Sequence, residues 1–402
     1  MKKIKPGFSK PSWLFIIIII ILFVICTFFV YKWRQSQTSL SQIETNYQTL
    51  LDLKNNLDTS LAFASGEINL LKSDDQFIKN NQLQKEIKDI KSGFSKAVEV
   101  YEDIIDLRDS RVRVSTIEPL FSSVLSDLSQ FKYDQSLLKI ATLSAKVTQE
   151  RQKSLTTVGS INPDNVVENS APPNSGFSRQ KVKVGDASFI VDIIAADLNS
   201  TRIIVDTASE SDCADNCPVL PLSTYISRNN AFAGINGSYF CPASYPSCAT
   251  KKNSFDTLLM SKNKKYFNSD NNVYSTVPAV IFSGNSARFV TQSLQWGRDT
   301  GVDSVLANYP LLVLNSSLAT GDSSDTKLSS TGNRAFIANK GSVVYIGVVR
   351  GVSAVGAAKV LVEMKMDNAL NLDSGGSTAL WSGGYKYGPG RDIPNAILFV
   401  RK

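Results

Sequence analysis

The sequence ALNLDSGGST at residues 369–378 joins an apolar run to a pair of glycines, and the interpretation of the C-terminal half depends on it. Taken alone, it predicts a strand ending in a glycine turn, with Asp373 accepting hydrogen bonds from the turn's own backbone. It would equally suit a ligand site, because Gly375 and Gly376 let the backbone approach a ligand and leave amides for an anion. By itself the stretch does not choose between a plain turn and a site.

Three further segments share its character: GINGSYF at 234–240, GNRAFI at 332–337 and RDIPNA at 391–396. Each places polar residues beside an apolar run, as strand ends do when they present side chains to a cleft. In this order the four segments resemble the phosphodiester glycosidase family, whose best-known member removes N-acetylglucosamine from a phosphodiester on mannose. The resemblance covers roughly residues 180–400.

The resemblance implies two catalytic residues, Asp373 acting at the sugar carbon as base or nucleophile and Arg334 binding the phosphate. It also implies a set of substrate-binding residues, in which the two asparagines would orient sugar hydroxyls: Asn236, Gly237, Asn371, Gly375, Gly376, Ser377 and Arg391, with Asn395 nearby. The chain departs from the family pattern at three positions. Ser238 and Tyr239 stand where glycine and phenylalanine are more usual, and Ser374 replaces the first glycine of a triplet.

The 402-residue chain contains no histidine, which excludes Ser-His-Asp and Cys-His catalysis. A glycosyl phosphodiester does not need histidine, because the departing phosphate monoester is already a stabilised anion. A second carboxylate would come from one of three aspartates that the sequence does not rank, namely Asp256, Asp303 and Asp392. A peptidase using Ser374 or Ser377 with a lysine is a third possibility, for which no lysine is indicated.

An uncharged apolar stretch runs from Pro11 to Tyr31, close to the roughly 20 residues that span a bilayer. Four lysines precede it and only Lys32 and Arg34 follow at once, which predicts a cytoplasmic N-terminus. A cleaved signal peptide is the alternative, but no small-x-small cleavage site follows. We expect a cytoplasmic tail at 1–12, a single-pass signal anchor in the cell membrane at 13–31, and an extracytoplasmic remainder.

Four of the five cysteines lie close together in the C-terminal half: Cys213, Cys217, Cys241 and Cys248. An even number in an exported domain favours two disulfides, and the spacing leaves all three pairings open. The rival interpretation is a zinc site of four thiolates, although the C-x-x-C spacing of zinc ribbons is absent.

Residues 36–156 carry apolar residues at helical spacing, such as Leu40, Ile43, Tyr47 and Leu50. They predict an all-α stalk, either a small bundle or an interrupted coiled coil, through which the chain could form a homo-oligomer. The predicted breaks are at 65–66, 73–75, 119 and 133–134. Residues 157–178 have the Pro, Asn and Ser content of a linker. Residues 179–402 then predict an α+β domain, with one helix at 354–366 and β-branched runs at 181–184, 189–194, 203–205, 277–282, 311–314, 343–349 and 396–400.

These features together predict a membrane-anchored extracytoplasmic hydrolase that cleaves sugar-1-phosphodiester linkages in envelope or exopolysaccharide glycans. A noncatalytic glycan-binding or scaffolding protein of the envelope is the alternative. The net charge of +7 is spread without the footprint of a nucleic-acid-binding protein. No cofactor is required by the sequence, and a divalent cation near Asp373 is possible without any visible ligand set.

Overall fold

The computed structural model of the chain describes residues 13–73, 75–157, 166–268, 276–323 and 325–402. The predicted cytoplasmic tail at 1–12 and residues 158–165 of the predicted linker lie outside these ranges. The chain divides into two compact units, residues 1–87 and residues 88–402.

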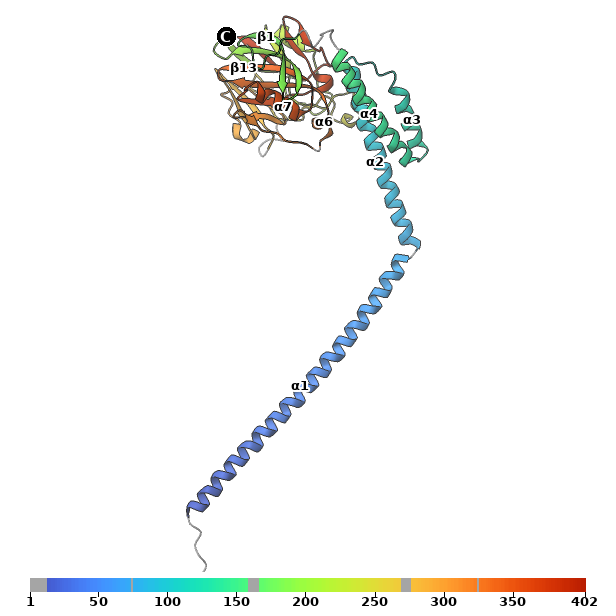
Figure 1. Cartoon of the computed structure of the whole chain (residues 1–402), viewed down its shortest axis with the longest axis vertical. Helices are drawn as coiled ribbons and strands as arrows, with labels where there is room; N and C mark the ends of the chain where they lie inside the picture. Colours follow the sequence, from blue (N-terminus) through green and yellow to red (C-terminus); the bar gives the residue numbers. More distant parts are fainter. Residues whose placement is uncertain (1–12, 74, 158–165, 269–275, 324) are drawn as a thin grey trace, which may run out of the picture. The chain divides into compact units, whose positions relative to one another are not determined.

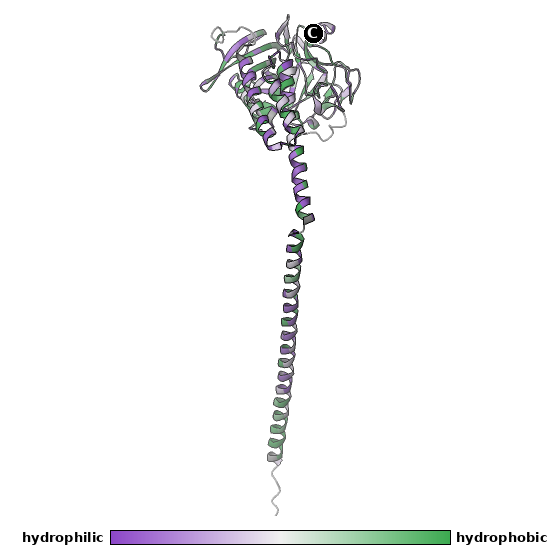
Figure 2. Ribbon diagram, turned by 90° about the vertical axis from the view of Figure 1, so that its right-hand side faces the viewer, coloured by the Kyte–Doolittle hydropathy of each residue, from purple (hydrophilic) through white to green (hydrophobic). Residues whose placement is uncertain are grey.

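Helix α1 (Trp13–Ser73) is a continuous helix of 61 residues that contains the predicted membrane anchor (Figure 1). The expected break at Ser65 and Gly66 is wrong. An isolated glycine costs about 1 kcal/mol relative to alanine inside a helix, and the good helix formers around it outweigh that cost. In the described part of the chain, one helix is long and apolar enough to cross a membrane, and a signal sequence near the N-terminus would meet the same test. Figure 2 shows this hydrophobic end of α1 in green.

Three helices follow, and each begins at or next to one of the other predicted breaks: α2 (Asp75–Asp109), α3 (Glu118–Ser129) and α4 (Tyr133–Thr157). Pro119 occupies the first turn of α3, where its missing N–H costs nothing. From residue 88 onward the three helices share one apolar core, which includes Ile104, Leu128 and Leu143. The predicted bundle is therefore present, although α1 precedes it as an unbroken rod.

The rest of the second unit is sheet-rich with few helices, as the α+β prediction required, and each predicted strand overlaps an observed one. The largest sheet has the order β1 (Gly176–Val184), β2 (Ala187–Asp197), β13 (Val343–Val352), β12 (Gly332–Lys340), β14 (Asn368–Asn371), β10 (Leu311–Leu314), β11 (Ser317–Leu318). A second has the order β16 (Tyr385–Tyr387), β15 (Leu380–Ser382), β4 (Ala233–Asn236), β17 (Asn395–Arg401), β3 (Thr201–Thr207). A third has the order β6 (Tyr266–Phe267), β5 (Leu259–Met260), β9 (Ser304–Ala307), β7 (Ala279–Ser283), β8 (Ser286–Val290).

The inner strands of the largest sheet are buried on both faces, which explains their runs of Val, Ile and Ala. One face packs on α7 (Ala354–Glu363), whose N-cap Ser353 accepts a hydrogen bond from the amide of Gly356. The other face contributes, with the two smaller sheets, to a core that contains Ile337, Leu370 and Phe399. The short elements are α5 (Leu222–Arg228), α6 (Thr326–Ser329), η2 (Pro246–Cys248), η4 (Ser293–Trp296) and η5 (Gly375–Ser377).

The four clustered cysteines form two disulfides, Cys213–Cys217 and Cys241–Cys248. Each bond closes a small loop. Because all four cysteines are paired, none of them is available as a thiolate for the alternative zinc site. The second loop contains Tyr245 and Ser247, which contact α2 as described below.

Candidate active site

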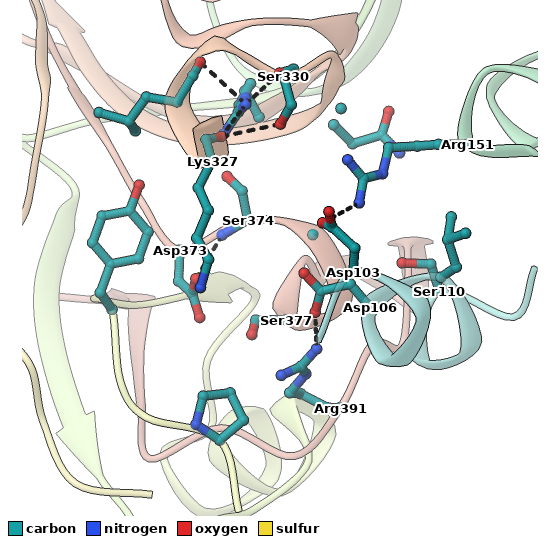
Figure 3. A pocket seen from close by; sticks show the side chains of 18 of the residues that line it. Asp103, Asp106, Ser110, Arg151, Lys327, Ser330, Asp373, Ser374, Ser377 and Arg391 are labelled. Atoms are coloured by element: carbon teal, nitrogen blue, oxygen red, sulfur yellow. Dashed lines mark hydrogen bonds and ion pairs between the residues drawn. The ribbon is translucent and has the colours of Figure 1, made fainter. Parts of the chain in front are cut away.

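Asp373 lies in the loop between the end of β14 and η5, and its backbone is held from two directions. Its amide donates to the carbonyl of Gly237 at 3.0 Å, and its carbonyl accepts from Nδ2 of Asn236 at 2.6 Å. Its carboxylate accepts hydrogen bonds from the amide of Ser374, 2.8 Å from Oδ1, and from the hydroxyl of Ser377. The loop therefore presents this carboxylate to the pocket in one orientation (Figure 3).

The surroundings of Asp373 favour its neutral form. Burial raises the pKa of Asp373 from 3.8 to about 7, although the hydrogen bond from Ser377 and the positive charge of Arg391 oppose that rise. The side chain is still partly open to the pocket. A carboxyl group with a pKa near the operating pH is suited to exchange a proton with a substrate or a water molecule.

The serine at 374, one of the departures from the family pattern, fits this loop without strain. Its φ of −136° is extended backbone that any residue adopts, whereas Gly375 has a φ of +67°. The Ser374 hydroxyl donates to the carbonyl of Leu372 at 3.2 Å and accepts from the amide of Ala335 at 3.3 Å. A hydroxyl used in this way supports the loop, and the peptidase interpretation gains nothing from it.

Arg334, the predicted phosphate ligand, lines the pocket at the start of β12 but uses one edge of its guanidinium on the backbone. Nη2 donates to the carbonyls of Lys327 at 2.7 Å and Ser330 at 2.6 Å, and Nε donates to Val352 at 3.3 Å. Burial lowers the pKa of Arg334, whose side chain is 6% exposed. The free edge for an anion is reduced to Nη1, so a bidentate contact through Nε and Nη2 would require these bonds to break.

The predicted sugar-orienting residues Asn236 and Asn371 are fully buried and support the pocket from behind. Asn236 holds the backbone of Asp373, and its Oδ1 accepts from the amide of Ala379 at 3.1 Å. Nδ2 of Asn371 donates to the hydroxyl of Tyr239 at 2.7 Å. Tyrosine at this position, where the family more usually has phenylalanine, thus supplies an acceptor for a buried amide.

Gly237 is required by a close approach. A Cβ there would lie 1.7 Å from Oδ1 of Asn395, which accepts from the amide of Ser238 at 2.9 Å. Asn395, the residue at the edge of the predicted site, therefore packs the Gly237 turn against β17. Ser238, the remaining departure from the family pattern, also accepts a hydrogen bond from Asn395 Nδ2 at 3.2 Å.

Arg391 and the two glycines meet helix α2. A Cβ on Gly375 would lie 3.0 Å from a carboxylate oxygen of Asp106, and one on Gly376 would lie 2.9 Å from the Cβ of Asp109. Arg391 forms ion pairs with both aspartates, at 3.1 Å from Asp109 and closer to Asp106. The glycines thus permit a close approach, and in this structure the group that approaches is a helix carrying two carboxylates.

Four acidic residues line this side of α2 at helical spacing: Glu102, Asp103, Asp106 and Asp109. The sequence had indicated no catalytic residues in the helical half. Asp103 pairs with Arg151 of α4 at 2.8 Å, and Oε2 of Glu102 lies 3.7 Å from Nζ of Lys327. The disulfide-closed loop adds contacts from Tyr245 and Ser247. The hydroxyl of Tyr245 donates to Asp106 at 2.6 Å, and the amide of Ser247 donates to Glu102 at 3.2 Å.

The resulting cavity of about 210 Å³ has walls from both the sheet domain and the bundle (Figure 3). Asp373 and Ser377 lie on one side, with Asp103 and Arg151 on the other. Tyrosines add apolar surface, and the rings of Tyr239 and Tyr309 meet edge to face at 4.9 Å. Polar donors among aromatic faces are a common way to bind a sugar ring.

The structure separates the three reserve carboxylates. Asp256 lines the cavity, and burial raises its pKa against the opposing charge of Lys251. Asp303 pairs with Arg202 at 2.9 Å, and Asp392 is exposed. Asp103 joins Asp256 as a candidate, because it lines the cavity and burial also raises its pKa.

Among the described residues, no group of three or more Cys, Asp or Glu side chains is placed to hold a metal ion. A divalent cation near Asp373 stays a prediction.

One protein-family model matches part of the chain. Residues 229–400 match the model of the phosphodiester glycosidase family (NAGPA), and the match excludes the helical half. No curated protein sequence matches the chain.

Solved structures that match the chain include three from different organisms. The catalytic domain of zebrafish N-acetylglucosamine-1-phosphodiester alpha-N-acetylglucosaminidase, auto-inhibited by its pro-peptide, is 14% identical over 59% of this chain and 87% of that one, with a TM-score of 0.44. A hypothetical protein from Synechocystis is 13% identical over 56% and 62% of the two chains, with a TM-score of 0.40. A putative exported protein from Burkholderia pseudomallei is 11% identical over 53% and 74%, with a TM-score of 0.35. The likeness to the family comes from the sequence match over residues 229–400.

Proposed function

We propose that the chain is a membrane-anchored hydrolase that cleaves sugar-1-phosphodiester linkages in envelope or exopolysaccharide glycans, because residues 229–400 match the phosphodiester glycosidase family. The observation that carries the proposal is the position of the Asp373 carboxyl group in a cavity bordered by basic side chains, where burial raises its pKa. A glycosidase of this class needs a carboxylate at the sugar carbon and a cation at the phosphate.

In the proposed reaction, the bond between the anomeric carbon and the phosphate oxygen breaks, and the phosphate monoester leaves with the electron pair. Because this leaving group is a stabilised anion, no general acid is required. The ionised form of Asp373 either takes a proton from the attacking water or attacks the sugar carbon itself; in the second case water then hydrolyses the glycosyl ester, which releases the sugar and restores the carboxylate. Ser377 and the amide of Ser374 keep the carboxylate oriented while it does so.

The phosphate would be held by Lys327 together with Nη1 of Arg334. Lys327 lines the cavity, its side chain is 63% exposed, and its contact with Glu102 is loose at 3.7 Å. Arg391 is less available, because two carboxylates of α2 already neutralise it. In this arrangement Arg391 binds the helical bundle, whereas Lys327 and Arg334 remain to bind the substrate.

A second carboxylate, where the mechanism needs one, would be Asp103 or Asp256. Asp103 is the stronger candidate, since Arg151 orients it and α2 presents it across the cavity from Asp373 (Figure 3). The catalytic site would then be composite, with one acid from the family domain and one from the bundle. The basis for this assignment is position and burial.

The noncatalytic alternative, a glycan-binding or scaffolding protein, is favoured by one observation. The ion pairs of Arg391 with Asp106 and Asp109 remove a cation from the glycine loop, where the family resemblance placed substrate binding. A site with this cation neutralised would suit an uncharged sugar better than a phosphodiester.

The proposed location follows from α1 and its flanking charges. An apolar run that continues into a long helix without a cleavage signal fits an uncleaved anchor, and the lysines before it favour a cytoplasmic N-terminus. Residues 88–402 would then work outside the membrane, where the two disulfides are stable.

The test is turnover by the full-length protein in detergent on three matched substrates: an alkyl sugar-1-phosphodiester, the sugar-1-phosphate monoester and the corresponding alkyl glycoside. The proposal expects free sugar from the diester, with loss of at least 100-fold in kcat for Asp373→Asn and no change for the exposed control Asp392→Asn. A folded protein that binds the sugars but releases none would overturn the glycosidase and leave the binding protein.

A further inference from the structure

Helix α1 carries a second sequence pattern beyond the membrane anchor. Between residues 40 and 71, the positions spaced alternately by three and four residues are occupied by Leu40, Ile43, Tyr47, Leu50, Lys54, Leu57, Leu61, Ala64, Ile68 and Leu71. This is a heptad repeat. Position a is occupied by Leu40, Tyr47, Lys54, Leu61 and Ile68, and position d by Ile43, Leu50, Leu57, Ala64 and Leu71. The eight large apolar residues in it are 51–69% exposed.

A stripe of this length and spacing fits another helix of the same repeat better than it fits a flat surface. In a coiled coil, each a or d side chain inserts between four residues of the facing helix, and this packing requires the repeat to continue over several turns. Leu51 and Leu53 flank the stripe at positions e and g and widen it. Positions b and c, on the opposite face of the helix, carry polar residues such as Gln42, Gln48 and Asn55.

We infer that residues 40–71 form a parallel coiled coil with a second copy of this chain. Three features favour this partner over an unrelated one. Lys54 is the only charged residue at an a or d position of the stripe, and a single lysine at position a restricts register and oligomer size. Glu67 at position g and Lys72 at position e are five residues apart, so they attract each other across a parallel, in-register pair.

The third feature is the apolar run that precedes the repeat. Two copies anchored by residues 13–31 in one membrane have their helices pointing the same way with the same residues at the same height. This arrangement disfavours an antiparallel pair and raises the effective concentration of the partner. The pair brings two catalytic domains to one site, which increases binding to a polymer with repeated sugar phosphates.

Cysteine cross-linking of the full-length protein in lipid nanodiscs tests the parallel arrangement. In a Cys26→Ser background, Ile43→Cys and Leu71→Cys are made separately; both are d positions, about 42 Å apart along the helix at 1.5 Å per residue. The inference expects a disulfide-linked dimer from each variant under mild oxidation and little from the control Leu70→Cys, which lies outside the stripe. Equal cross-linking at all three positions, or none at the two d positions, overturns it.

Measurement of mass in detergent gives an independent test. Light scattering should give the protein mass of two chains for the wild type and 43.9 kDa, the mass of one chain, for Leu57→Glu. The matched control Leu70→Glu makes the same chemical change on the same helix and should stay dimeric. A wild-type monomer, or equal masses for both variants, contradicts the inference, and turnover by the catalytic domain is not required for either result.

Discussion

Replacing Asp373 by asparagine should make the folded protein more stable while it removes activity. In the unfolded chain this carboxyl group ionises near pH 3.8, whereas in the folded protein its pKa is about 7 because it is buried. Between these values the folded state keeps a proton that the unfolded state has lost, so stability falls as the pH rises. Above pH 7 the full penalty is present, and below pH 3.8 it is absent.

The size of the effect follows from that shift. A difference of about 3 pH units at about 1.4 kcal/mol per unit gives an upper value of about 4 kcal/mol. Since the side chain is partly open to the cavity, we expect about 2–4 kcal/mol at pH 8. Asparagine keeps an oxygen that can accept the hydrogen bond from the amide of Ser374, so this contact survives the substitution.

The assay is urea unfolding of residues 88–402, one compact unit, at pH 4, 6 and 8. Asp373→Asn should match the wild type at pH 4 and exceed it increasingly up to pH 8, while the exposed control Asp392→Asn should follow the wild type throughout. A variant that is equally stable at every pH, or less stable at pH 8, would refute the argument that burial holds this carboxyl group near neutrality.

Three further outcomes are expected. Gly376→Ala places a Cβ 2.3 Å from Nη2 of Arg391, so it should lower the free energy of unfolding by about 1–3 kcal/mol, measured by thermal melts. The control Gly321→Ala has open space around it and should lower it by less than about 0.5 kcal/mol. Asp103→Asn should lower kcat by roughly 100-fold if Asp103 is the second carboxylate; an unchanged kcat, with loss in Asp256→Asn instead, assigns the role to Asp256. Replacing Cys241 and Cys248 by serine should increase proteolysis within α2, because their loop holds Tyr245 and Ser247 against that helix. Replacing Cys213 and Cys217 by serine is the control. Equal cleavage in the two variants would show that the Cys241–Cys248 loop does not stabilise α2.

The loop around Asp373 was predictable from sequence because its determinants are local. A glycine pair after an apolar strand restricts the backbone to a turn, and the Asp373 carboxylate accepts from the amide of the next residue. The residues at which α2, α3 and α4 begin were predictable for the same reason. The continuous passage of α1 through Gly66 shows that a local signal can be outweighed by its neighbours.

The contribution of α2 could not be predicted, since its partners are remote in sequence. Asp106 and Arg391 are 285 residues apart, and Glu102 is 145 residues from Ser247. In a single sequence, acidic residues that contribute to a site look the same as acidic residues on the solvent-exposed face of a helix. The same limit applies to Arg334, whose residue type predicts phosphate binding but whose Nε and Nη2 groups are used by backbone carbonyls.

We propose that the protein breaks the bond between the anomeric carbon and the phosphate oxygen. Hydrolysis in ¹⁸O-labelled water tests this most directly. Mass spectrometry of the products from a sugar-1-phosphodiester should place the label in the released sugar and leave the phosphate monoester unlabelled. Label in the phosphate would mean attack at phosphorus, which would make the protein a phosphodiesterase and contradict the role given to Asp373.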